Sequence, residues 1–364
     1  MMALYDFERN QQLVLIKSHL SRHGDLVRQT EGSFGEVFTL ETNAYPTHII
    51  AKCPKISKFG NAATARQALG KLVTELEVTL KYYRHSGVQR IASIELVHAW
   101  PFLISRKRKG TLADLIAEPN GWSIRDKVMS LTQIAHTLNY CRKLGLVAHQ
   151  DIKPANIFFD DPVDKYAIDR ARYTGLLHEM YVADFGIADA FRDIGQNSGS
   201  RPYMPPEQYE RGLIDGSKID VFALGVITYE CLMDGLHPIG ERTADVWPTK
   251  LPDKASKWTH EDVWKKWSRQ DKSEALSKTS QDLLPALRSL IEAALSADLE
   301  QRPSMDEFEV RLRMVLASVD TSASEGLSVQ LAYLDSLADS SGDSGWPYME
   351  DKLRELREFY ARWS

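Results

Sequence analysis

The run from Ala148 to Asn156, AHQDIKPAN, places an acid, an amine and an amide close together. Asp151 could accept the proton of a hydroxyl group, and Lys153 could neutralise charge on a phosphoryl group during transfer. Asn156 could hold a metal ion through its side-chain oxygen. Taken alone, such a polar turn is equally typical of an ordinary capped loop.

A second acidic motif, Val182-Ala183-Asp184-Phe185-Gly186, follows an apolar run later in the chain. A carboxylate at the end of a hydrophobic strand is suited to bridging two phosphates through Mg²⁺. The two motifs in this order and spacing favour chemistry over two unrelated loops.

A glycine-rich turn, TEGSFGEV at 30–37, lies between two runs that alternate like strands. Gly32 and Gly35 carry no Cβ, so backbone N–H groups can approach phosphate oxygens closely. Alone, the turn fits a plain hairpin about as well. Lys52 ends the next apolar run and could reach the phosphates that such a turn covers.

Together these motifs resemble the signature set of the eukaryotic-type (Hanks-type) serine/threonine protein kinases, over about residues 26–317. Glu75, preferred to Glu77 on the apolar spacing around it, matches the glutamate of the family's αC helix. The remaining matches are Gly199 to Glu207 as the end of the activation segment, Asp220 as the aspartate that braces the catalytic loop, and Arg302 as the arginine that pairs with Glu207.

The resemblance implies ATP with Mg²⁺, or with Mn²⁺ in its place, bound between two lobes. It implies that Val37 and Ala51 pack on the adenine, and that Lys52 and Glu75 hold the α- and β-phosphates. By role, the implied residues are Asp151 and Lys153 for catalysis; Thr30, Gly32, Gly35, Val37, Ala51, Lys52 and Glu75 for ATP; Asn156 and Asp184 for metal; and His149, Phe185, Gly186, Ser198, Ser200, Glu207, Asp220 and Arg302 for structure or regulation.

The elements that must position these residues differ between the two parts of the chain. Residues 26–53 predict short strands, and 64–84 predict a helix. Later segments near 124–144, 217–233, 281–296 and 304–317 are helical. We expect an α+β, bilobal protein-kinase-like fold: an N-terminal extension at 1–25, a small β-rich N-lobe with the αC helix at 26–105, and a larger, mainly α-helical C-lobe at 106–317. An acidic linker and C-terminal helix follow at 318–364.

Composition narrows the class of protein. The 364 residues hold 45 basic and 50 acidic side chains, so the formal net charge of −5 gives no reason to expect nucleic acid as a partner. Three cysteines do not make a disulfide scaffold, and they fit a reducing, cytoplasmic location. The longest apolar run, 221–233, is too short for a membrane span, and no secretory signal is expected.

Two positions depart from the family pattern. Thr30 replaces the first glycine of the phosphate loop, and Gln150 replaces the arginine that usually precedes the catalytic aspartate. In the family that arginine anchors an activation-loop phosphate, so we expect activity without phosphorylation of Ser198 or Ser200. The expected function is phosphoryl transfer from ATP to Ser/Thr hydroxyls of protein substrates, this chain included.

Two other functions stay open. A pseudokinase, acting as a nucleotide-binding regulatory or scaffold module, would explain Thr30 and Gln150, although Lys52, Asp151, Asn156 and Asp184 are all present. A small-molecule kinase is disfavoured, because those relatives usually lack the glutamate and arginine matched here.

Three surface features carry alternatives of their own. The tail after 318 holds nine acidic and four basic residues, and thus the whole net charge. Its Ser/Gly/Asp-rich part predicts a linker, and Tyr348, Leu353, Leu356, Tyr360 and Trp363 lie on one face of a short helix. The tail could pack on the protein, be autophosphorylated, or act as a pseudosubstrate near the basic run 106–109, which is otherwise a solvated face. The Trp-rich region 247–267 could dock a partner or pack internally.

Overall fold

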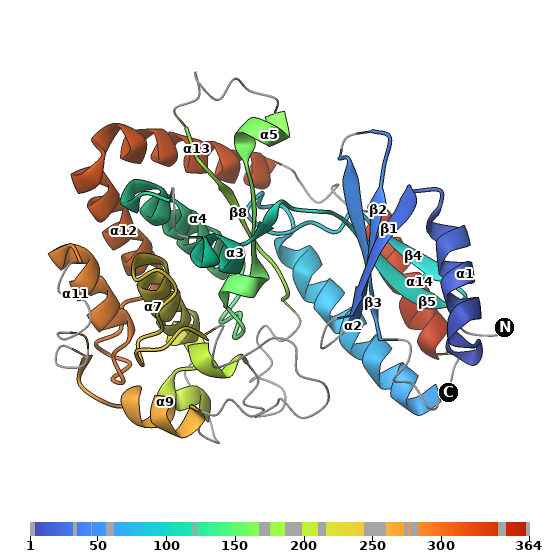
Figure 1. The fold of residues 1–364 in the computed structure, drawn as a ribbon, viewed down its shortest axis with the longest axis horizontal. Coiled ribbons are helices and arrows are strands. Elements are labelled where there is room, and N and C mark those ends of the chain that lie inside the picture. Colours follow the sequence, from blue (N-terminus) through green and yellow to red (C-terminus); the bar gives the residue numbers. More distant parts are fainter. Residues whose placement is uncertain are drawn as a thin grey trace. The chain divides into compact units, whose positions relative to one another are not determined.

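A computed structural model describes residues 4–31, 35–44, 46–55, 62–118, 122–166, 175–185, 199–209, 216–243, 260–272, 276, 283–340 and 347–361 (Figure 1). The chain divides into two compact units. Unit 1 comprises 1–84, 89–108 and 341–364, and unit 2 comprises 85–88 and 109–340. The expected division at 105/106 thus lies close to the main division at 108/109. Each unit is described by itself.

Unit 1 is built on a five-stranded sheet in which every neighbouring pair is antiparallel. Its strands follow the order β1-β2-β3-β5-β4 across the sheet. Their bounds are β1 Asp25–Glu31, β2 Gly35–Glu41, β3 His48–Pro54, β4 Ser93–Val97 and β5 Trp100–Arg106.

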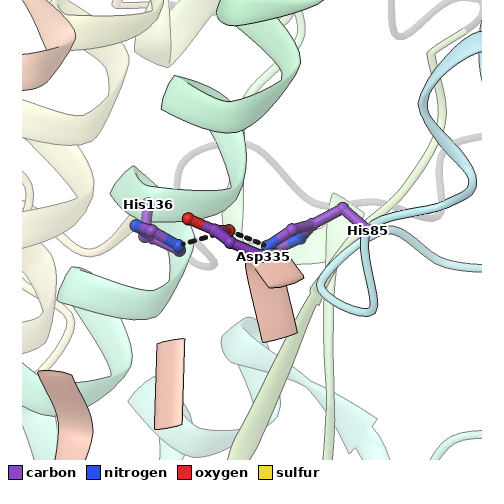
Figure 2. A group of neighbouring side chains, drawn as sticks. All are labelled: His85, His136 and Asp335. Carbon is purple, nitrogen blue, oxygen red and sulfur yellow. Dashed lines mark hydrogen bonds and ion pairs between the residues drawn. The ribbon is translucent and has the colours of Figure 1, made fainter. Parts of the chain in front are cut away.

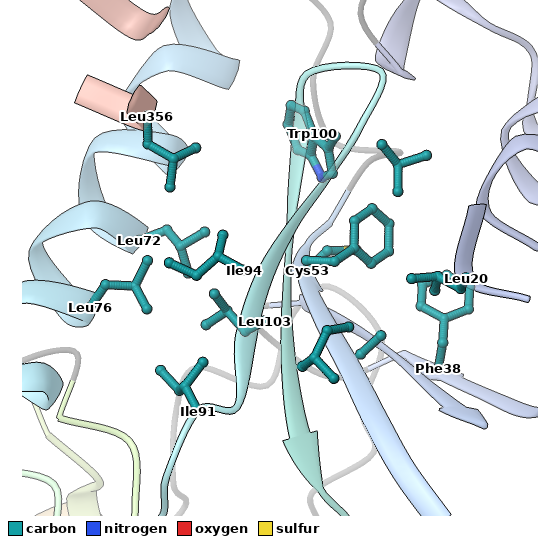
Figure 3. Close-up of a cluster of buried hydrophobic side chains, with 14 of the residues drawn as sticks. Leu20, Phe38, Cys53, Leu72, Leu76, Ile91, Ile94, Trp100, Leu103 and Leu356 are labelled. Carbon is teal, nitrogen blue, oxygen red and sulfur yellow. The ribbon is translucent and has the colours of Figure 1, made fainter. Parts of the chain in front are cut away.

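Helices from both ends of the chain complete unit 1. They are α1 (Arg9–Leu20), α2 (Ala62–Tyr82) and α14 (Pro347–Ala361), with a short 3-10 turn η1 (Leu4–Asp6). Their apolar side chains join those of the sheet in one buried cluster (Figure 3). The expected extension at 1–25 therefore belongs to this core, to which it gives Leu4, Ile16 and Leu20.

Unit 2 is mainly helical, with a small sheet in the order β6-β7-β8. Its core forms around α7, where every residue from Ile219 to Cys231 is buried, and α12 packs on α4. Its elements are β6 Gly110–Thr111, α3 Leu112–Ala117, α4 Ile124–Lys143, η2 Pro154–Asn156, β7 Ile157–Asp160, α5 Pro162–Tyr166, β8 Glu179–Val182, η4 Arg201–Tyr203, η5 Pro206–Tyr209, η6 Gly216–Lys218, α7 Ile219–Leu232, α9 Glu261–Trp267, α11 Pro285–Ala294, α12 Met305–Val319 and α13 Thr321–Ser340.

The five predicted helices are confirmed to within a few residues as α2, α4, α7, α11 and α12. The predicted linker after 318 is wrong over 321–340, where the chain forms the 20-residue helix α13. Asp320 caps this helix, because its Oδ1 accepts the backbone N–H of Ala323 at 2.9 Å. Leu327, Leu331 and Ala338 are buried at helical spacing, and this burial stabilises the helix.

Polar contacts also hold α13 on unit 2. The Asp335 carboxylate lies between the rings of His85 and His136, with Oδ1 at 3.3 Å and 3.0 Å from their Nε2 atoms (Figure 2). The hydroxyl of Tyr140 on α4 donates to Asp339 at 2.9 Å. Among the described helices, none is both long and apolar enough to cross a membrane.

Candidate active site

A buried carboxylate holds the loop of unit 2 that contains Asp151, which is called the catalytic loop below. Asp220, in the first turn of α7, accepts the backbone N–H groups of His149 at 2.7 Å and Gln150 at 2.9 Å. Burial raises the pKa of Asp220, although these hydrogen bonds and the nearby charges oppose the rise. Gln150 adopts a left-handed conformation with φ of 68°, which is unfavourable for a residue other than glycine, and its bond to Asp220 helps to hold it there.

His149 links the catalytic loop to the second acidic motif. Its Nδ1 accepts the N–H of Asp151 at 3.4 Å, and its Nε2 donates to the carbonyl of Ala183 at 3.0 Å. Its ring packs against Phe185 with centroids 4.6 Å apart. The loop and the segment around Asp184 are therefore tied to each other through the side chain of His149.

The Asp151 carboxylate has two different oxygens. Oδ2 accepts from Lys153 Nζ at 2.7 Å and from Asn156 Nδ2 at 3.1 Å. Oδ1 makes no hydrogen bond within the described part of the chain, although it is buried. An unpaired buried oxygen costs free energy. It is placed to accept one more hydrogen bond.

Lys153 also reaches the activation segment. Its Nζ donates to Ser200 Oγ at 2.8 Å, and Ser200 is 7% exposed. Gln208 Nε2 donates to the carbonyl of Gln150 at 3.2 Å, so the segment is bonded to both sides of Asp151. Gly199 has a φ of 145°, and a Cβ there would lie 2.8 Å from the carbonyl oxygen of Gln150, so this close approach requires glycine.

Two side chains of unit 2 fit a hard divalent cation. Asn156 donates from Nδ2 to the backbone oxygen and carboxylate of Asp151, which leaves its amide oxygen as the acceptor atom. Asp184 is half-buried and left-handed with φ of 66°, directly after the residue that His149 bonds. An amide oxygen and a carboxylate are ligands that Mg²⁺ prefers, so this donor set fits the expected metal.

A buried ion pair fastens the end of the activation segment to unit 2. Arg302 Nη1 and Nη2 donate to the two oxygens of Glu207 at 2.6 and 3.3 Å. The same guanidinium donates to the carbonyls of Lys218 and Ser296, and its side chain is 0% exposed. The match of Arg302 to Glu207 inferred from the sequence is thus a contact in the structure.

In unit 1, the strands bring part of the expected nucleotide set together. Val37 lies opposite Lys52 and Thr30, so the three share one face of the sheet. A Cβ on Gly35 would lie 2.4 Å from the carbonyl oxygen of Cys53, so glycine is required there by the neighbouring strand.

Ala51 is placed differently from the expectation. It lies opposite Phe38 and is 0% exposed in the core of unit 1, on the face away from Lys52. Side chains alternate along a strand, so the residue directly before the lysine cannot share its face. Ile50, which the sequence reasoning missed, lies on the face of Lys52 and Val37.

Several expected residues cannot be placed. Gly32, Gly186 and Ser198 lie outside the described residues. Glu75 lies on α2, but its side chain is not described. Glu77, the alternative that was set aside, has its carboxylate bonded by Arg357 of α14.

The described part of the Trp-rich region packs internally. Trp264 is 0% exposed, and its Nε1 donates to the carbonyl of Met204 at 3.0 Å. Trp267 stacks on it with centroids 5.1 Å apart. Trp247 and Trp258 lie outside the described residues. In the described part, the tryptophans support the activation segment from within.

The basic run 106–109 has partners other than the tail. Lys109 Nζ lies 3.3 Å from Asp161 and 2.6 Å from Asp164, and these hydrogen bonds raise its pKa. Arg108 donates to Gln89 at 2.7 Å. The acidic helix α13 instead contacts His85, His136 and Tyr140.

The cluster of His85, His136 and Asp335 has the composition of a metal site, but its hydrogen bonds oppose that function (Figure 2). The backbone N–H of Gly87 donates to His85 Nδ1 at 3.1 Å, so a neutral ring carries its proton on Nε2, where a metal needs a lone pair. His136 has carboxylate oxygens at both ring nitrogens, Glu309 at 2.9 Å and Asp335 at 3.0 Å. Both ring nitrogens of His136 thus have carboxylate partners, and the cluster is a polar anchor for α13.

Comparisons with known proteins agree with this geometry. The family model described as the protein kinase domain matches residues 30–310. The SNF1-like protein kinase ssp2 of Schizosaccharomyces pombe is 24% identical over 226 residues, which cover 60% of this chain and 35% of that protein. The human calcium/calmodulin-dependent protein kinase type 1B is 26% identical over 237 residues, 62% of each chain.

A plant protein kinase is similar to this chain at about the same level of identity. The calcium-dependent protein kinase 33 of Arabidopsis thaliana is 24% identical over 265 residues, which cover 68% of this chain and 48% of that protein. The chain thus matches between about a third and two thirds of the length of these relatives.

Proposed function

Because the chain belongs to the protein kinase family, we propose that it transfers the γ-phosphoryl group of ATP to serine or threonine hydroxyls of proteins. One observation carries this proposal. The Asp151 carboxylate is held through Oδ2 by Lys153 and Asn156, while Oδ1 is left without a hydrogen bond within the described residues. The free oxygen of Asp151 is therefore available to accept the hydrogen of a substrate hydroxyl.

The acceptor hydroxyl binds at Oδ1 of Asp151, which orients the hydroxyl and takes its proton as the phosphoryl group is transferred. Lys153, bonded to the other oxygen, neutralises negative charge on the transferred group. Lys153 and Asn156 already hold Oδ2 of Asp151 before a substrate binds, so little reorganisation is needed when charge develops.

Asn156 and Asp184 are the residues that would hold Mg²⁺, which neutralises phosphate charge when it is bound. Their positions are set by groups on this chain. Asn156 is fixed by Asp151, and Asp184 follows the carbonyl that His149 bonds. Substitution of Asn156 or of Asp184 should therefore alter the affinity for the metal without removing the proton acceptor, Asp151.

Lys52 of unit 1 pairs with the α- and β-phosphates, and Glu75 of α2 orients it. Val37 lies on the same face of the sheet as Lys52 and contacts the adenine. We assign the second adenine contact to Ile50 in place of Ala51, because Ile50 shares that face and Ala51 is buried in the core.

Activity does not require phosphorylation of Ser198 or Ser200. Gln150 stands where an arginine would bind an activation-loop phosphate, and an amide carries no charge to do so. Ser200 is buried, and its hydroxyl is bonded by Lys153, which gives it a positioning role. We expect Ser198→Ala to retain transfer within about threefold, which is under 1 kcal/mol.

The pseudokinase alternative predicts nucleotide binding without transfer, and one assay separates it from the proposal. Purified protein is incubated with γ-³²P-ATP, Mg²⁺ and a basic acceptor protein, and the phosphoamino acids are then identified. We expect label on serine or threonine of the acceptor, and of the chain itself, with wild type and none with Asp184→Asn. Nucleotide binding with no label above the Asp184→Asn control would support the pseudokinase and refute the proposal.

A further inference from the structure

The C-terminal helix α14 is part of the hydrophobic core of unit 1. Leu353 is 6% exposed and Leu356 is 0% exposed, and both join the cluster formed by the sheet and α2. In Figure 3, Leu356 points toward Leu72 of α2. A helix of this length is marginal in water, so α14 owes its stability to this packing.

The partner of α14 is the helix that carries Glu75. α14 packs against α2 and β4. At the surface, Arg357 Nε donates to Glu77 Oε1 at 2.8 Å. On α2, Leu69, Leu72, Val73 and Leu76 are buried at helical spacing, so removal of α14 would expose part of this face.

α14 is also outside the part of the chain that the kinase domain model covers. The match ends at residue 310, and α14 begins at Pro347. The contact with α2 is therefore made by a segment that lies outside the matched domain. It connects the last segment of the sequence to the element on which the Lys52–Glu75 pair depends.

We propose that Leu353, Leu356 and Arg357 are positioning residues that hold α2 in the place required for catalysis. The proposal rests on the proposed kinase function, through the assignment of Glu75 to Lys52. The apolar contacts of the two leucines hold α14 on α2, and the ion pair with Glu77 sets its register. Loss of α14 from this surface leaves α2 free to move, which lowers phosphoryl transfer.

The first test measures α2 directly by hydrogen–deuterium exchange on the full chain. In the Leu353→Ala/Leu356→Ala variant we expect faster exchange in peptides from 62–82 and from α14. Peptides from α7, in unit 2, should keep their wild-type protection. Faster exchange in α14 with unchanged protection of 62–82 would overturn the proposal, and this readout does not depend on enzymatic activity.

The second test measures activity on the same proteins. We expect the double leucine variant to lower kcat at least tenfold, with the KM for the acceptor protein within about twofold of wild type, because the residues assigned to the acceptor lie in unit 2. Glu355→Ala is the matched control, since Glu355 lies on the exposed side of α14 and is 55% exposed. An equal loss in Glu355→Ala, or no loss in the leucine variant, would contradict the proposal.

A charge exchange keeps the test valid if the leucine variant does not fold. Arg357→Glu places two like charges together at an exposed position and should raise exchange in 62–82. Glu77→Arg/Arg357→Glu restores opposite charges and should restore protection. Failure of the exchanged pair to restore protection would overturn the role of this contact. If wild type transfers no phosphate, the kinase function fails, whereas the exchange experiment still decides whether α14 holds α2.

Discussion

Substitution of Arg302 should be among the most destabilising changes in unit 2. Its guanidinium makes five hydrogen bonds, two to Glu207, two to the carbonyl of Ser296 and one to that of Lys218. It also lies over the ring of Phe222, 4.9 Å from the centroid. Arg302→Leu removes this cation–π contact and leaves three acceptor groups without their donor.

The magnitude follows from burial. The Arg302 side chain is 0% exposed and that of Glu207 is 13% exposed, so water cannot replace the lost bonds. Removing one partner of such a pair costs about 3–5 kcal/mol. We expect the free energy of unfolding, measured with urea, to fall by that amount. Transfer should fall as well, because Glu207 anchors the end of the activation segment.

A double-mutant cycle isolates the ion pair from the rest. Glu207→Gln removes the charge and keeps the size, and we expect the two substitutions together to cost at least about 1 kcal/mol less than their sum. Arg302→Lys is the control, because it keeps the charge and loses the two-pronged geometry. A loss below about 1 kcal/mol for Arg302→Leu would refute the reasoning, since it would mean that the pair contributes no more than an exposed one.

Three further predictions concern stability in unit 2. Burial raises the pKa of Glu230 to about 7. The folded protein thus favours the neutral acid and loses stability as pH rises from about 4.5 through 7. The free energy of unfolding of Glu230→Gln relative to wild type, measured in urea titrations, should therefore be on the order of 3 kcal/mol more favourable at about pH 8 than at about pH 4. An equal effect at both pH values would contradict this. Burial opposes ionisation of Glu309, but bonds from His136, Arg313 and Asn139 outweigh it and lower its pKa to about 2. The stabilisation by the ionised Glu309 carboxylate is present above about pH 4.5 and is lost as pH falls toward 2. The loss of unfolding free energy in Glu309→Gln, on the order of 3 kcal/mol at pH 7, should therefore shrink in acid. A loss independent of pH would exclude an ionised Glu309 in the folded protein. Trp264→Ala should lower the unfolding free energy by about 3–5 kcal/mol and reduce transfer, whereas full activity would show that support of Met204 is not needed.

Much of unit 2 could be predicted from the sequence because its chemistry is local. Asp151, Lys153 and Asn156 lie within one turn of chain, and the structure joins them by hydrogen bonds. The pairs Asp220 with the loop and Arg302 with Glu207 are distant in sequence, and only the family resemblance indicated them.

The misplacements have physical causes that can be named. The family resemblance indicated Ala51 as an adenine contact, although strand alternation places the adjacent residues Ala51 and Lys52 on opposite faces. Helix α13 was missed because its first turns are rich in serine, which is typical of a linker. The signal was present, since Leu327, Leu331 and Ala338 follow helical spacing after a capping Asp320.

The role of α14 in the fold could be predicted only in part. The apolar spacing of Leu353 and Leu356 indicated a helix with one buried face. Nothing in that spacing identified α2 as the surface that the face covers, because the two helices are separated by most of the chain. Tertiary packing alone decides such a contact.

The catalytic role of Asp151 is tested most directly by its isosteric replacement. In Asp151→Asn, the rate of phosphoryl transfer at saturating ATP and Mg²⁺ should fall by about 10²–10⁴-fold, the usual contribution of a general base. The dissociation constant for ATP with Mg²⁺, measured on the same preparation, should stay within about twofold, since Asp151 is assigned to the acceptor and not to the nucleotide. Transfer within a few-fold of wild type would contradict the account.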